Sequence, residues 1–323
     1  MGGVGGDEGP GLPNPQALRP TPSNRLMVEN GSITAAGLIS SDPDPFKWRM
    51  GVKPLELANW LLLDEQRARE LEEIGQLIDR YRDDIIYCES NAIPVCEELA
   101  TEVLQHLRQI PGFELADLDD QAPSLIEAIR RIIQEDICVL ERRPSGWTMT
   151  ACAVAIPTQW DVASKFGKTL DTIHEPVPRY DIDLSQAMST FFDRLRPEKP
   201  VWRANRTLTD DPSLRLVPKR RHQPMRNDIT VDNVADQVWL RVEYQTLRRL
   251  AQSDAIIFTI RILRQSIRSV AVHPEVLAEL LRSVSRLPAD VRDYKDSTAR
   301  HAEIIKEWAL STGVLTQQSL EKH

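Results

Sequence analysis

The residues best suited to chemistry surround His174, which lies between Ile173 and a rigid Glu-Pro-Val-Pro sequence. Pro176 and Pro178 fix their own φ angles and restrict the residues before them, so the backbone that leaves the histidine is stiff. An imidazole on such a loop can present one ring nitrogen to a metal centre or to the face of a cofactor. Since no second histidine occurs at metal-binding spacing, the alternative is an ordinary packed or surface histidine.

A second group of polar side chains lies in an expected β-strand at residues 236–247. Arg241, Glu243 and Gln245 share one face of this strand, because side chains alternate between the two faces. If that face borders a pocket, Arg241 and Glu243 form a desolvated pair that can polarise a ligand. If the face lies in water, the three residues are the polar side of an ordinary antiparallel strand.

A third group occurs in an expected strand at residues 201–208, where Arg203 and Asn205 share one face. If this strand is a neighbour of the previous one, the two would present arginines and amides to the same recess. A compact cationic recess of this kind suits an anion such as a haem propionate, or oxygen at an iron centre.

Five β-strands must position these residues, and they are expected at 137–143, 147–156, 201–208, 236–247 and 255–263. The first two flank a Pro-Ser-Gly turn, and the last two are joined by a short polar link, so each pair is predicted to form a hairpin. Apolar residues spaced three or four apart predict helices over 55–81 and 95–107, from 123, over 184–195, from 274 and around 304. The pattern predicts an α+β fold, with N-terminal and C-terminal helices packed on an antiparallel sheet.

Composition divides the chain into three regions. Residues 1–44 contain glycine pairs and prolines but almost no apolar periodicity, so a disordered tail is expected there. Residues 45–311 are predicted to form a single domain. Residues 312–323 are expected to be a flexible C-terminal tail.

The charge and hydropathy of the 323-residue chain exclude several classes of protein. The net charge of -8 argues against non-specific nucleic-acid binding. No apolar run is long enough to span a membrane, so a cytoplasmic protein is expected. The one basic cluster, residues 218–226, is either a solvated loop or a docking patch for an acidic electron-transfer partner.

Several separated segments resemble the alpha-subunit-like family of haem-dependent oxidative N-demethylases. These segments are, in order, PFKWRMGVKPLELANWL, QEDICVLER, W-x6-GK-x3-TIHEPVP, F-F-x2-L, VWRAN, LRVEYQTLRRL and AIIFTIRIL. The similarity covers roughly residues 45–300.

This resemblance implies a PAS-like fold, in which a five-stranded antiparallel sheet and its helices enclose a b-type haem. By the same resemblance His174 is the proximal iron ligand, and Arg203 and Asn205 also belong to the cofactor-binding set. The catalytic polar pocket would be formed by Arg241, Glu243 and Gln245.

The activity implied is a monooxygenase reaction in which O2 is used to oxidise or N-demethylate a small amine. By the same resemblance, electrons would come from NADPH through a separate flavin and iron–sulfur reductase. The absence of clustered cysteines in this chain agrees with an external supply of electrons. A PAS-like haem gas or redox sensor without turnover is the alternative, and a protein that has lost haem is a third. Arg206 stands where the family commonly has tryptophan, which places dimethylamine as the substrate in doubt.

Overall fold

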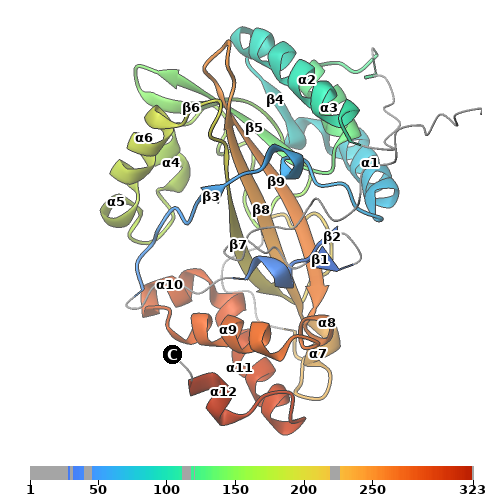
Figure 1. Ribbon diagram of the computed structural model, residues 1–323, viewed down its shortest axis with the longest axis vertical. Helices are drawn as coiled ribbons and strands as arrows, with labels where there is room; N and C mark the ends of the chain where they lie inside the picture. Colours follow the sequence, from blue (N-terminus) through green and yellow to red (C-terminus); the bar gives the residue numbers. More distant parts are fainter. Residues whose placement is uncertain are drawn as a thin grey trace, which may run out of the picture.

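The computed structural model describes residues 28–29, 32–39, 46–110, 118–119, 121–218 and 226–321. A long, twisted antiparallel sheet runs through the middle of the molecule, and three groups of helices surround it (Figure 1). The mixture of helices with an antiparallel sheet confirms the predicted α+β class. Most of residues 1–44, and residues 219–225 of the basic cluster, lie outside the described residues.

The main sheet has seven strands within the described ranges, in the order β3-β7-β8-β9-β5-β6-β4. These strands are β3 (Lys53–Pro54), β4 (Ile86–Cys88), β5 (Asp136–Arg143), β6 (Gly146–Ala153), β7 (Val201–Thr209), β8 (Trp239–Arg249) and β9 (Ile256–Ser266). A separate two-stranded sheet pairs β1 (Val28–Glu29) with β2 (Ser32–Ile33).

The prediction of a five-stranded sheet was wrong in its count. All five expected segments are strands, but β3 and β4 extend the sheet at its two edges. β3 pairs through Lys53 with Trp202, and β4 pairs through Tyr87 with Cys152. Runs of two and three residues are too short to display the alternation by which a strand is recognised in a sequence.

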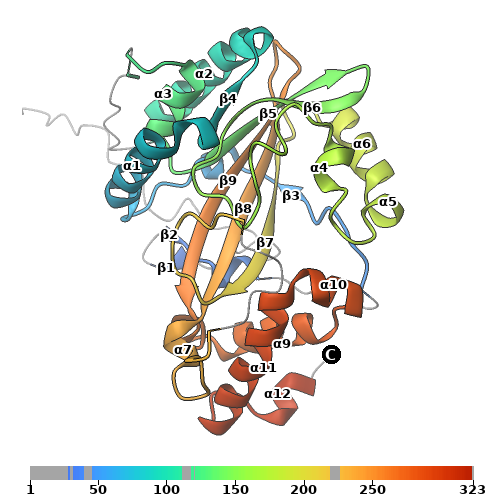
Figure 2. The same ribbon diagram turned by 180° about the vertical axis from the view of Figure 1, so that it is seen from behind.

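The helices form an N-terminal group, a middle group and a C-terminal group (Figures 1 and 2). The N-terminal group is α1 (Arg67–Ile85), α2 (Ile93–Arg108) and α3 (Leu125–Ile132). The middle group is α4 (Leu170–His174), α5 (Tyr180–Asp183) and α6 (Ser185–Arg194). The C-terminal group is α7 (Val234–Gln237), α8 (Ile267–Val270), α9 (Pro274–Ser285), α10 (Ala289–Tyr294), α11 (Asp296–Ser311) and α12 (Gln317–Glu321). Three short 3-10 turns cover Ala36–Leu38, Leu57–Asn59 and Ser90–Ala92.

Helix α12 lies within the segment that was expected to be a flexible tail, and the Arg282 guanidinium of α9 donates a hydrogen bond to the Ser319 carbonyl. Of all the described helices, none has both the length and the apolar character needed to cross a membrane.

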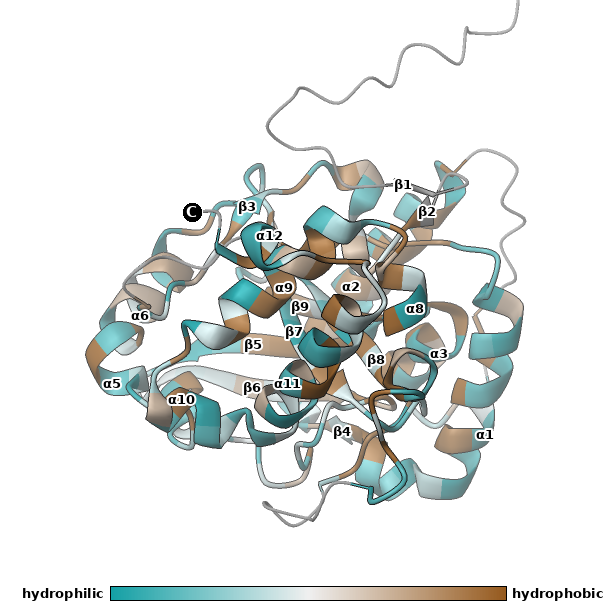
Figure 3. Cartoon of the chain, turned by 90° about the horizontal axis from the view of Figure 1, so that it is seen from below, coloured by the Kyte–Doolittle hydropathy of each residue, from teal (hydrophilic) through white to brown (hydrophobic). Residues whose placement is uncertain are grey.

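The sheet separates two hydrophobic cores. On β5, Ile137 and Val139 belong to the larger core, which also contains residues of α1, α2, α3, α9 and α11. Cys138 and Leu140 project to the opposite face and pack with the middle helices in the smaller core. Figure 3 shows hydrophobic residues concentrated along β5 and β8 in the middle of the molecule. Two neighbouring residues of one strand therefore lie in different environments.

A buried ion pair positions the chain that leaves β6. Arg130 and Asp136 are almost inaccessible to solvent, and their side chains are 2.8 Å apart. Asp136 also accepts hydrogen bonds from the backbone amides of Ala155 and Ile156, at 2.8 and 3.1 Å. Since each charge and each amide is satisfied, the pair holds residues 155–156 against the sheet, next to the site described below.

Candidate active site

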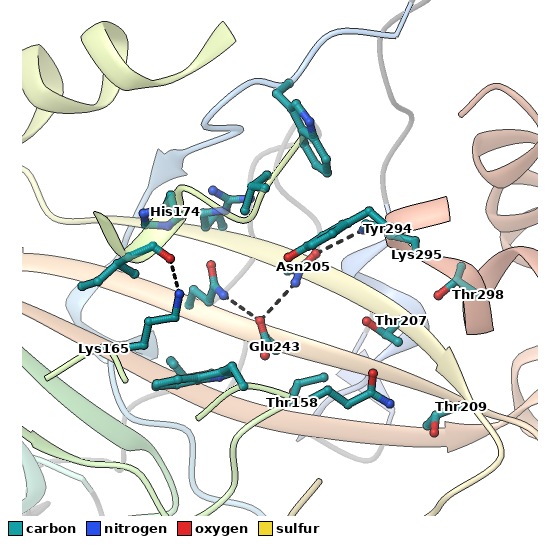
Figure 4. A pocket seen from close by; sticks show the side chains of 18 of the residues that line it. Thr158, Lys165, His174, Asn205, Thr207, Thr209, Glu243, Tyr294, Lys295 and Thr298 are labelled. Carbon is teal, nitrogen blue, oxygen red and sulfur yellow. Dashed lines mark hydrogen bonds between the residues drawn. The ribbon is translucent and has the colours of Figure 1, made fainter. Parts of the chain in front are cut away.

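A cavity of about 820 Å³ lies between the sheet, the middle helices and the α10–α11 junction. This volume is within the range of about 300–1,000 Å³ that is usual for small-molecule and cofactor sites. Its apolar part is lined by Met50, Cys138, Leu140, Met149, Leu170, Ile173, Val177, Leu184, Met188, Phe192, Leu247 and Phe258. Figure 4 shows polar side chains on the strands across from the helix that carries His174.

His174 occupies the last position of α4 and borders this cavity. Its Nδ1 is 2.8 Å from the Leu170 carbonyl, and because a carbonyl only accepts, Nδ1 must carry the hydrogen. Burial lowers the pKa of His174, and the charges of Arg203 and Lys165 lower it further. The ring is therefore neutral at pH 7, and no described residue forms a hydrogen bond with Nε2. A neutral imidazole with a free Nε2 lone pair has the tautomer that a metal ligand requires.

Aromatic stacking holds the orientation of the imidazole. The ring of Tyr180 lies 5.1 Å from the ring of His174, at an interplanar angle of 14°. The Tyr180 hydroxyl donates a hydrogen bond of 2.8 Å to Asp171, which is one turn of chain away from the histidine. Burial raises the pKa of Tyr180, so the hydroxyl keeps its proton. The histidine is thus held both through its backbone-bonded Nδ1 and through its ring face.

A hydrogen-bonded chain lies on the sheet side of the cavity (Figure 4). Glu243 Oε2 accepts hydrogen bonds from the side-chain amides of Asn205 at 3.1 Å and Gln245 at 2.8 Å. Lys295 Nζ in turn lies 3.5 Å from Asn205 Oδ1. The register explains this grouping, because Asn205 of β7 is directly opposite Glu243 of β8. No described residue forms a hydrogen bond with Glu243 Oε1, so one carboxylate oxygen is available to a ligand.

Arg203 is a second charged group on the cavity wall, one position along the same face of β7. Burial lowers the pKa of its guanidinium, while the negative charge of Glu243 opposes this shift. Its Nε is buried and has no hydrogen-bond partner among the described atoms. A desolvated cation without a full set of acceptors fits an anionic ligand group.

Arg241 shares a face of β8 with Glu243 and Gln245, as expected, but its side chain is used by the backbone. It donates hydrogen bonds to Thr158 Oγ1, to the Ile156 and Pro157 carbonyls, and to the Ser213 and Leu214 carbonyls. It is not among the residues that line the cavity. Burial lowers the pKa of Arg241 to about 10, which still leaves the guanidinium charged at pH 7. The structure therefore places Arg241 behind the wall of the cavity.

Arg206 also lies outside the cavity lining. Residues alternate along β7, so the cavity face carries Arg203, Asn205, Thr207 and Thr209, and Arg206 projects to the other side. Whichever side chain stands at position 206, it therefore makes its contacts outside the pocket.

Three residues that the sequence analysis did not assign to the site also line the cavity. Trp48, in the segment 46–52 that crosses the cavity, donates from Nε1 to the Pro178 carbonyl at 2.8 Å. Lys165 donates to the Ile173 carbonyl, and burial lowers the pKa of this lysine. Lys295, at the α10–α11 junction, lies 5.7 Å from the centre of the Trp48 ring. Trp48 could have been identified from the sequence, because it belongs to the PFKW motif of the segments that resemble the family. Nothing in the local sequence indicates that Lys295 lies next to β7.

The part of the chain that the structure describes contains no group of three or more His, Cys, Asp or Glu side chains suited to a metal ion. An iron centre with a single protein ligand is different, because in a haem the macrocycle would itself supply most of the iron ligands.

A scan against protein-family models matches residues 109–305, more than half of the chain, to the model described as "Haem-dependent oxidative N-demethylase, alpha subunit-like". The match includes the segments with His174, Arg203 and Glu243 and begins after the segment with Trp48. The cavity, with its neutral histidine and its charged wall, lies almost wholly within the matched residues. The chain therefore belongs to the haem-dependent oxidative N-demethylase, alpha subunit-like family.

Proposed function

We propose that this protein is a haem-dependent oxidoreductase of the monooxygenase type, in which His174 ligates a b-type haem and a small methylated amine is N-demethylated. The observation that carries this proposal is the state of His174. It is a neutral imidazole with its Nδ1 hydrogen bonded to a backbone carbonyl, and it lies on the wall of an 820 Å³ cavity.

The described side chains fit a haem. Nε2 of His174 is the free donor for the iron, and the largely apolar lining from β5, β6, α4 and α6 suits a macrocycle. Arg203, whose Nε lacks a partner, would hold a propionate. The Leu170 carbonyl and the Tyr180 ring would keep the imidazole from turning.

A haem bound here would supply the redox centre at which O2 is reduced and an N-methyl group is oxidised. The protein's own contribution is positioning and charge. Glu243 Oε2 is held by Asn205 and Gln245, which leaves Oε1 to accept a hydrogen bond from a protonated amine. Because the carboxylate is 8% exposed, its attraction for a cation is stronger than in water. Trp48 and Lys295 both line the cavity, with Lys295 Nζ 5.7 Å from the centre of the Trp48 ring, and would displace water from this part of its wall.

The five long strands support a PAS-like arrangement, which we propose for this domain. Numbered along the chain, they lie in the order 3-4-5-1-2, so the first and last strands are adjacent at the centre. The middle helices cover one face of this sheet and enclose the cavity against it.

A separate reductase is part of the proposal, because the four cysteines offer no cluster site. Cys96 and Cys152 are buried, and burial raises the pKa of each thiol, which disfavours the thiolate that a metal cluster requires. The family description as an alpha subunit also supports an assembly with other chains.

The test is haem titration of the purified chain, followed by turnover. The wild-type protein should develop a Soret band with one equivalent of haem, and His174→Ala should shift or lose that band. His273→Ala, at a histidine outside the cavity, is the matched control and should behave as the wild type. A wild-type protein that does not bind haem would refute the proposal.

Turnover separates the enzyme from the sensor. The reduced haem protein is given O2 and methylated amines, and formaldehyde is measured. Substrate-dependent formaldehyde supports the demethylase. Haem binding without any formaldehyde across the panel would favour a gas or redox sensor.

A further inference from the structure

The cavity continues past Glu243 to the end of β7, where its lining becomes polar. This polar end is lined by Thr207, Thr209, Asp210, Thr298 and His301. The four strand positions between Asn205 and Thr209 span about 13 Å. The polar end is thus one compartment of a continuous cavity, distant from helix α4, which carries His174 (Figure 4).

Two buried threonines at this end have hydroxyl hydrogens to donate. Thr209 Oγ1 accepts a hydrogen bond from the Asp211 amide at 3.1 Å. Thr298 Oγ1 accepts one from the Leu208 amide at 3.0 Å. Both side chains are only 3% exposed. Each oxygen accepts one of these bonds, so each threonine can still donate its hydroxyl hydrogen and has one lone pair left.

His301 is the least satisfied polar residue of this compartment. It is 1% exposed, and neither ring nitrogen has a hydrogen-bond partner of good geometry among the described atoms, although the Ser297 carbonyl lies close enough to the ring to raise the pKa of His301. Burial lowers the pKa of His301, although the nearby charge of Asp210 opposes the shift. The ring is therefore neutral and has one donor and one acceptor nitrogen. Buried polar groups are nearly always bonded in native proteins, so a ring nitrogen without a partner beside a cavity indicates a missing polar partner.

The charges at this end disfavour an anionic partner. Arg300 is paired with Asp296 at 2.8 Å, and Arg226 is paired with Asp228. Asp210 is half-buried and adds an acceptor at the rim. With its cations already paired and a carboxylate present, the polar end suits a neutral chain that carries hydroxyl groups.

We propose that the polar end binds the hydroxylated chain of a substrate whose methylated amine lies at Glu243, so that the substrate class is N-methylated amino alcohols or amino sugars. This inference rests on the proposed function. Dimethylamine is too short to reach Thr209 and would leave His301 without a partner.

The reaction balances with one molecule of O2. The substrate R–NH–CH3, O2, two electrons from the external flavin or iron–sulfur reductase and two protons give R–NH2, formaldehyde and water. The N–CH3 bond breaks and the methyl carbon leaves as formaldehyde. The nitrogen remains on the chain R as the product amine R–NH2.

The experiment is calorimetric titration of the haem-loaded protein with N-methylglucamine, which has a six-carbon hydroxylated chain, and with dimethylamine. N-methylglucamine should bind at least about tenfold more tightly, because each additional hydrogen bond to a buried group contributes a several-fold gain in affinity. The double variant Thr209→Val with Thr298→Val, and the single variant His301→Phe, should each lose most of that gain. Dimethylamine affinity should stay within about twofold of the wild type.

The matched control is His106→Phe. His106 is also a buried histidine with an unpartnered Nε2, but it packs on Trp60 and does not line the cavity. This variant should bind both amines as the wild type does.

The outcomes are distinct. Equal affinity for the two amines, or unchanged N-methylglucamine binding in the polar-end variants, overturns this inference and leaves the demethylase proposal in place. Tighter binding of N-methylglucamine that is lost in those variants supports it. A chain that binds no haem overturns both proposals.

Discussion

Arg241→Met is the most informative substitution for the architecture of the site, because it separates a structural arginine from a catalytic one. The wild-type side chain is 1% exposed and donates to carbonyls of two segments, residues 156–157 and 213–214. Methionine retains much of the buried volume and removes every donor. The carbonyls of Ile156, Pro157 and Leu214, in buried residues, are then left without this donor.

The expected loss follows from these contacts. A typical hydrogen bond contributes about 1 kcal/mol, and an unpaired buried acceptor costs about 1–3 kcal/mol. The Pro157 carbonyl keeps its hydrogen bond from the Leu216 amide, so two carbonyls, those of Ile156 and Leu214, are left unpaired. With partial access of water to them, we expect the free energy of unfolding to fall by about 2–4 kcal/mol. Urea unfolding monitored by far-UV circular dichroism measures it.

A local readout accompanies this global one. The amides of Gln159 and Leu216 bond across the two segments, to the carbonyls of Leu216 and Pro157. Their hydrogen exchange should accelerate in Arg241→Met more than that of amides in β9. Arg142→Met, at a half-exposed arginine of β5 that pairs with Asp193, is the control and should cost less than about 1 kcal/mol. If Arg241→Met abolishes formaldehyde production while unfolding like the wild type, the arginine acts in catalysis and the reasoning is wrong.

Three further predictions concern single residues. Glu243→Gln should raise KM for a methylated amine about tenfold, because the charge that attracts the ammonium group is lost. The haem spectrum should stay unchanged. An unaltered KM in steady-state kinetics would contradict this role of Glu243. Burial raises the pKa of Glu135 from an ordinary 4.5 to about 7. The folded chain therefore binds a proton at this carboxyl more readily than the unfolded chain does. The stability that this proton contributes is lost as pH rises through about 7. Glu135→Gln should therefore flatten the decline in unfolding free energy between pH 5 and 8 by up to about 3 kcal/mol, and parallel pH profiles in the two proteins would disprove the shift. Tyr180→Phe retains the stack on His174 but loses the hydrogen bond to Asp171. The haem affinity measured by Soret titration should therefore fall about threefold to tenfold. A larger loss would show that the hydroxyl does more than orient the ring.

Much of the fold was predictable because period-two and period-3.6 patterns are local signals. β8 illustrates this: Leu240, Val242 and Tyr244 were expected on one face and lie in the larger core, whereas Glu243 and Gln245 line the cavity. Arg241 shows the limit of the pattern. Its face was predicted, but the carbonyls that it binds come from a loop after β6 and a loop after β7, which no alternation rule brings together.

The candidate site was predictable only in part for a similar reason. His174 was found from its rigid flanking sequence, and Asn205 and Glu243 were grouped because their strands were expected to be neighbours. Lys295 comes from a helix junction ninety residues after Asn205 and has no motif around it. The ring nitrogen of His301 that lacks a partner cannot be detected in a sequence at all, because a missing partner is a property of packing.

The alternation along β8 also has a consequence for how this protein can diversify. Glu243 and Gln245 face the ligand side, and Val242 and Tyr244, which alternate with them, are anchored in the larger core. Substitutions at Glu243 and Gln245 can therefore adapt the protein to new compounds while the scaffold stays intact. An insertion or deletion of one residue would exchange the two sets at once, so related proteins should differ here by replacement and keep the strand's length.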